Sequence, residues 1–109
     1  MLFRSSTVHT AAGSGANGAG AAVQLPDVCT GFHDDQMHWT RQSIRFGIDG
    51  VTHFEYLNLG AGSARWPFDA PQFLILNVAI GGDLGGQVDD SIFPVRMEVD
   101  HVRVYQQPK

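Results

Sequence analysis

The feature that most constrains the fold is a pair of alternating segments on either side of Asp49-Gly50. Residues 43–48 alternate between apolar and polar side chains, which is the period of a half-buried strand. Asp49-Gly50 is a strong hairpin signal, because a two-residue turn of type I′ needs positive φ at both central positions. Residues 51–57 then return as the partner strand. The sequence therefore predicts an antiparallel β-hairpin here.

The longest apolar run, residues 73–82, contains one polar side chain, Asn77. The run is too short to cross a bilayer, which takes about 20 apolar residues in a helix. Its β-branched and aromatic content predicts a buried strand. An unpaired amide in such a strand costs about 1–3 kcal/mol. Asn77 therefore either bonds to neighbours in the core or faces a cleft, and we favour the cleft.

Shorter patterns complete an all-β prediction. Residues 5–10 and 32–39 resemble strands, and residues 95–106 alternate with a change of phase that predicts a β-bulge near residues 100–101. Residues 11–22 are small and glycine-rich, which predicts a flexible loop. Short strands separated by glycine-rich turns, without a long helical pattern, indicate a β-sandwich or barrel.

Length and charge narrow the class of protein. The 109 residues suffice for one domain, which we expect to span residues 1–109. The formal net charge of −4, without a basic run, argues against nucleic-acid or anionic-membrane partners. A single cysteine, Cys29, excludes an internal disulfide. Residues 1–4 are too short for a signal peptide, and no transmembrane segment is expected after them.

Four blocks of the sequence carry a family resemblance. They are STVHT at residues 6–10; FH, WT, SIRF and DG across residues 32–50; WPFD leading into FLILNVAIGG over residues 66–82; and FP, MEVD and VRVY across residues 93–105. In this order and spacing they resemble the C-terminal half of glycoside hydrolase family 16, the laminarinase-like β-1,3-glucanases. The resemblance covers nearly all of residues 5–106. It implies part of a jelly-roll β-sandwich of antiparallel strands, with β-glucan bound on a concave face.

The resemblance also implies a reaction whose catalytic groups are missing from this sequence. Retaining glycosidases use a carboxylate nucleophile and a carboxyl acid/base about 5–5.5 Å apart. The family supplies them as Glu-x-Asp-x-x-Glu on one strand, expected shortly before residue 6. No such motif occurs, and the only glutamates are Glu55 and Glu98. We therefore expect a truncated glucanase-like domain with no catalytic residue of its own and with residual β-glucan binding.

Binding residues are carried over from the same resemblance. His9 and Asn77 match positions that line the family's cleft near the cleaved sugar. Trp66 lies either at the cleft edge, where its ring can stack on a sugar, or packed under the loop. Asp100 matches a calcium ligand of the family, so a structural calcium is implied, although no cofactor is required. Family members are typically secreted.

A partial sandwich has consequences for association. Its exposed strand edges and apolar face favour self-association. We therefore expect a homodimer or higher homo-oligomer in which a second copy supplies the missing layer. Two alternatives to glucan binding stay open. One is a hydrolase with a different active site at an oligomer interface, with aspartates and His9, His33 or His101 as base. The other is a structural or interaction module without a substrate.

Two further polar groups are weaker candidates. Alternation points His33 and Asp35 to one side of a strand and Asp34 to the other, which favours a solvated edge over a metal cluster. His53 and Glu55 share a strand face and could form an acid/base pair, but a cross-strand surface pair is favoured.

Overall fold

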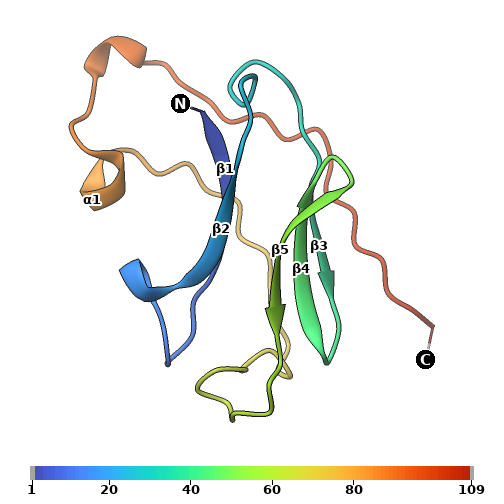
Figure 1. The fold of residues 1–109 in the computed structure, drawn as a ribbon. Helices are drawn as coiled ribbons and strands as arrows, with labels where there is room; N and C mark the ends of the chain where they lie inside the picture. Colours follow the sequence, from blue (N-terminus) through green and yellow to red (C-terminus); the bar gives the residue numbers. More distant parts are fainter. Residues whose placement is uncertain (1, 109) are drawn as a thin grey trace. The chain divides into compact units, whose positions relative to one another are not determined.

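The computed structural model describes residues 2–108 and divides into two compact units (Figure 1). Unit 1 runs to Gln72, and unit 2 begins at Phe73. All described strands belong to unit 1. Among the described residues, no helix has the length and apolarity needed to cross a membrane.

Unit 1 consists of two antiparallel sheets. The first sheet pairs β1 (Phe3–Val8) with β2 (Ala19–Gln24). The second sheet has the order β3-β4-β5 and contains β3 (Asp35–Trp39), β4 (Ser43–Ile48) and β5 (Val51–Leu57). β2 lies beside β5, so the two sheets are neighbours within the unit. The predicted all-β class with antiparallel strands is confirmed.

The β4–β5 hairpin forms as predicted, with both strands at the predicted bounds. Asp49 has φ of 52° and Gly50 has φ of 84°, so both turn positions are left-handed. Asparagine, aspartate and glycine tolerate this conformation better than other residues. The local sequence therefore determines this element.

A β-bulge interrupts the hairpin. Phe46 pairs with Phe54, whereas the next residue, Gly47, pairs with Thr52, so His53 is the extra residue. A bulge of this kind increases the local twist and redirects side chains. His53 points to the other sheet, where its Nε2 lies 3.0 Å from the hydroxyl of Ser6.

The core of unit 1 is small. The buried apolar side chains come from the end of β1, from β4 and from the segment after β5: they are Val8, Ile44, Ile48 and Trp66. Phe46 and Phe54 stack across the hairpin with ring centroids 5.9 Å apart. Aromatic pairs at such distances add to the stability gained by burial.

The predicted flexible loop over residues 11–22 is wrong in its second part. Residues 15–17 form a 3-10 turn, and residues 19–22 belong to β2. The small residues there serve close strand pairing. A Cβ atom on Gly20 would lie only 2.3 Å from the carbonyl oxygen of Ser6 on β1.

Unit 2 contains one turn of α-helix, α1 (Gly82–Gly85), and a 3-10 turn, η2 (Asp90–Ile92), but no strand among its described residues. The predicted buried strand over residues 73–82 is therefore wrong, and Phe73 and Ile75 are 85% and 70% exposed. The predicted strand over residues 95–106 and its bulge are also wrong. A strand requires a hydrogen-bonded neighbour, and no strand among the described residues pairs with either segment.

Candidate functional site

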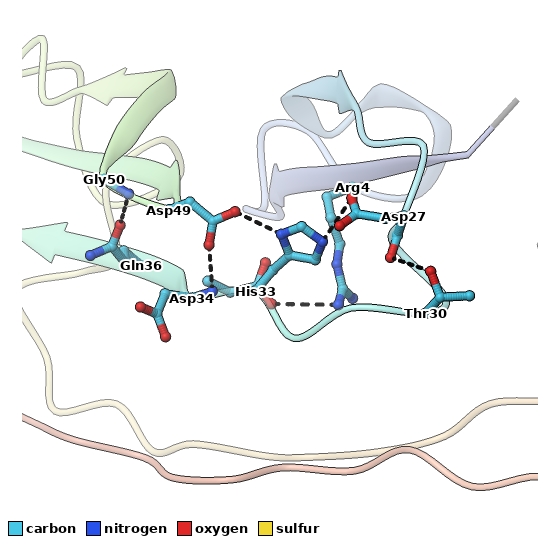
Figure 2. A network of polar contacts seen from close by, with 9 residues as sticks. Arg4, Asp27, Thr30, His33, Asp34, Gln36, Asp49 and Gly50 are labelled. Atoms are coloured by element: carbon cyan, nitrogen blue, oxygen red, sulfur yellow. Dashed lines mark hydrogen bonds and ion pairs between the residues drawn. The ribbon is translucent and has the colours of Figure 1, made fainter.

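The best-defined polar cluster of unit 1 surrounds His33 (Figure 2). His33 lies near the end of the segment of residues 25–34, which connects β2 to β3. Its Nδ1 is 2.6 Å from Oδ2 of Asp49 in the β4–β5 turn, and its Nε2 is 3.2 Å from Oδ1 of Asp27 in the connecting segment. The imidazole is only 8% exposed. The ring therefore lies between two carboxylates from separate parts of the chain.

Backbone groups support the Asp49 side of this cluster. The other carboxylate oxygen of Asp49 accepts a 2.9 Å hydrogen bond from the Asp34 N–H, and the Asp49 N–H donates to the Asp34 carbonyl at 3.0 Å. The Gly50 N–H donates to the Gln36 side chain at 2.6 Å. The turn is thus held against the beginning of β3.

The two acidic neighbours change the ionisation of this group. The hydrogen bond to Asp49 raises the pKa of His33 above its usual value, the negative charge of Asp27 adds to the rise, and burial opposes it. The same hydrogen bond, followed by that from the Asp34 N–H, lowers the pKa of Asp49. Both shifts favour a charged pair.

This geometry argues against His33 as the base of a different hydrolase. A general base needs a ring nitrogen within hydrogen-bond reach of the substrate proton. Both ring nitrogens of His33 already face carboxylate oxygens. The sequence pattern placed His33 on a solvated edge and did not find this cluster, because its partners are 6 and 16 positions away.

His9 lies one residue beyond β1 and is exposed. A Cβ atom on Gly18 would lie 3.2 Å from both Cε1 and Nδ1 of the imidazole, so glycine at this position leaves space for the ring. A neighbouring cavity of about 120 Å³ is lined by Thr10, Asn17 and Tyr56, among others. Ligand pockets usually measure about 300–1,000 Å³, so this cavity alone is too small for a sugar chain.

Trp66 is packed in an aromatic cluster. It is 5% exposed, its ring is nearly parallel to that of Tyr56 at 5.9 Å, and Phe68 meets it edge-on at 5.4 Å. Its Nε1–H donates to Asp69 at 3.2 Å. The structure thus favours the packing alternative over stacking on a sugar, and a binding role for Trp66 stays a prediction.

The remaining predicted site residues belong to unit 2. Asn77 is exposed, whereas His9 and Trp66 belong to unit 1, so the predicted cleft residues are divided between the units. Asp100 is exposed, with its carboxylate 3.3 Å from Nδ1 of His101. The roles of His9 and Asn77 in sugar binding stay predictions.

The described residues do not assemble the implied calcium site. Calcium takes six to eight oxygen ligands. Residues 2–108 hold no group of three or more histidine, cysteine, aspartate or glutamate side chains suited to a metal ion. Asp100 as a calcium ligand therefore also stays a prediction.

The predicted cross-strand surface pair exists, with Arg45 as the partner of Glu55. The Arg45 Nε–H donates to the Glu55 carboxylate at 3.0 Å. This bond is the main cause that lowers the pKa of Glu55. His53 bonds to Ser6 instead, which removes the support for a His53–Glu55 acid/base pair.

Known proteins share sequence with this chain over most of its length. No protein-family model matches the chain. A β-glucanase of Rhodothermus marinus is 38% identical over 109 residues, which cover 92% of this chain and 38% of the relative. A keratan-sulfate endo-1,4-β-galactosidase of Sphingobacterium multivorum is 35% identical over 104 residues, which cover 94% of this chain and 25% of the relative.

A solved structure agrees with these relatives. It is the crystal structure of a mutant of a non-specific endo-β-1,3(4)-glucanase from glycoside hydrolase family 16, co-crystallised with an oligosaccharide and presenting a 1,3-β-D-cellobiosyl-glucose at its active site. The match has a TM-score of 0.78 and 38% identity and covers 84% of this chain and 37% of the glucanase.

These findings define a glycosidase-like, all-β chain with part of a jelly roll. More narrowly, the chain is homologous to a C-terminal portion of the β-glucanases of glycoside hydrolase family 16, as its motifs predict. It spans well under half the length of the relatives that it matches.

Proposed function

We propose that the chain recognises β-glucan with the surface that corresponds to the glucanase cleft. The observation that carries this proposal is the match to a glucanase crystal structure with an oligosaccharide at its active site, which extends over 84% of the chain. His9 and Asn77 are the residues proposed to contact the sugar. Residues 1–109 contain no Glu-x-Asp-x-x-Glu, so the proposal concerns recognition of the sugar by these residues and not its hydrolysis.

Isothermal titration of the full chain with laminari-oligosaccharides tests this function. We expect heat of binding, and a lower affinity in His9→Ala and Asn77→Ala. His38→Ala is the matched control, because His38 is also an exposed histidine of unit 1 but has no proposed contact with sugar. An absence of heat at millimolar ligand, or an equal loss in all three variants, contradicts the proposal.

We also propose that the chain self-associates. The support is the number of large apolar side chains that unit 2 leaves exposed, among them Phe73, Leu74, Ile75, Leu76, Val104 and Tyr105. Large contiguous apolar surfaces are rare on monomeric proteins and usually mark an interface. A second copy that adds strands to these segments would supply the missing ladder partners.

A further inference from the structure

One histidine links the segment that connects the two sheets of unit 1 to the β4–β5 turn. The segment of residues 25–34 leaves β2 and enters β3, and His33 joins it to the β4–β5 turn through Asp49. Within the segment, the Gly31 N–H donates to the Asp27 carbonyl at 2.9 Å, which closes a turn that begins at Asp27. None of these residues is among those proposed to contact the sugar.

The protonation state of the His33 ring decides whether the ring attracts both carboxylates. A neutral imidazole has one N–H donor and one acceptor nitrogen, whereas an imidazolium has two donors. An ionised carboxylate only accepts. With Asp49 at Nδ1 and Asp27 at Nε2, a neutral ring can satisfy one carboxylate and must turn a lone pair toward the other. Only the charged ring attracts both.

The two contacts are unequal. Nδ1 and Asp49 form a hydrogen bond of 2.6 Å. Nε2 lies 3.2 Å from Asp27 but has no aligned hydrogen-bond partner, so this second contact acts chiefly through charge. Asp49 therefore contributes more than Asp27 to holding the ring.

We propose that Asp27, His33 and Asp49 form a proton-dependent clasp that holds the segment of residues 25–34 against the β4–β5 turn. The His33 clasp is closed when the ring is charged. When the ring loses its proton, the attraction to one carboxylate becomes repulsion, and the part of the segment before Asp34 is released while the strands remain paired.

The neighbouring charges set the pH range of the clasp. Besides Asp27 and Asp49, the nearby charged groups are Asp34, which follows His33 in the chain, Asp35 at the start of β3 and Arg4 of β1, whose guanidinium is 3.9 Å from Asp35. The acidic groups outnumber the single cation and favour the charged ring. The positive charge of Arg4 disfavours the charged His33 ring, but Asp35 partly neutralises that charge.

The direction of the pH dependence follows from these shifts. Folding raises the pKa of His33 above its usual value of about 6.5. The contribution of the clasp is then complete below about pH 6.5 and is lost as pH rises through the raised pKa.

Side-chain ¹⁵N NMR of the full chain from pH 5 to pH 9 tests the clasp. We expect the His33 nitrogens to report an imidazolium at pH 6.5 and to titrate at higher pH. Asp49→Asn should lower the midpoint more than Asp27→Asn, and His38→Gln should leave it unchanged. Hydrogen exchange, corrected for intrinsic rates, should show the amides of Thr30 and Gly31, which bond to the Asp27 carbonyl, losing protection as the ring titrates while β4 keeps its protection.

Two results would overturn the proposal. One is a neutral His33 ring at pH 6.5 in the wild-type chain. The other is equal protection of the Thr30 and Gly31 amides on both sides of the His33 midpoint. Both readouts use the wild-type chain, so the test remains decisive even if Asp49→Asn fails to fold.

Discussion

The role of Trp66 could not be decided from the sequence alone. An indole in a glycosidase-like motif suits either sugar stacking or packing, because both use the same aromatic face. The structure fills that face with Tyr56 and Phe68 and satisfies the indole N–H with Asp69. Packing and sugar stacking are distinguished here by neighbours as far as ten positions away in the sequence. A short motif contains no information about such contacts.

Removing the Trp66 side chain should destabilise unit 1. Truncation of a buried aromatic residue costs about 3–5 kcal/mol. We expect Trp66→Ala to lose stability in this range in urea unfolding monitored by circular dichroism. Trp39→Ala is the control, because Trp39 is 41% exposed and should lose less. Equal losses in the two variants would disprove a special packing role for Trp66.

Gly50 is required by its backbone conformation. Its φ of 84° lies in the left-handed region, where a Cβ atom costs about 1–2 kcal/mol. We expect Gly50→Ala to destabilise the chain by about this amount in the same assay. Gly85→Ala, at a position in open space without a left-handed φ, should change stability less. A Gly50→Ala variant as stable as wild type would refute the type I′ requirement.

At the scale of elements, the sequence correctly predicted the features that depend on a few neighbouring residues. The β4–β5 hairpin has the predicted bounds because alternation and the Asp49-Gly50 turn act over a few residues. The bulge predicted near residues 100–101 is absent, because residues 95–106 form no strand among the described residues. The bulge at His53 was not predicted, because its register depends on the partner strand. Residues 19–22 resembled a loop because a composition rule does not detect close strand pairing.

The Asp49 carboxylate makes the β4–β5 turn sensitive to acid. Bonds from His33 and the Asp34 N–H lower the pKa of Asp49 below its usual value. Its stabilising contribution is therefore present above about pH 3.9 and is lost as pH falls through the lowered pKa. Urea unfolding at pH 5 and at pH 2.5 should show a larger acid loss in wild type than in Asp49→Asn. Identical losses would contradict the assignment.

At the scale of the whole molecule, the sequence predicted the family and the all-β class but not the pairing of unit 2. Residues 73–82 have the composition of a buried strand, yet burial and ladder bonds depend on neighbours that the described chain does not provide. The division of His9 and Asn77 between two units has the same origin. A sequence motif predicts which residues can line a cleft. Whether a cleft forms depends on how the sheets assemble.

Self-association is a prediction at this scale. The exposed apolar residues of unit 2 should find strand partners in a second copy. Light scattering with size-exclusion chromatography at micromolar concentration should give a dimer or larger species. Asp or Lys substitutions at Ile75 and Val104 should shift the distribution toward the monomer, while Thr52→Lys in unit 1 should not. A monodisperse wild-type monomer would contradict self-association.

The most direct test of glucan recognition is an NMR titration of the ¹⁵N-labelled chain with a laminari-oligosaccharide. We expect dose-dependent amide shifts confined to residues near His9 and to residues 73–82, with the hairpin turn at Asp49-Gly50 unaffected. Spectra that stay unchanged at millimolar ligand, or shifts spread evenly over the chain, would contradict a glucan-binding surface.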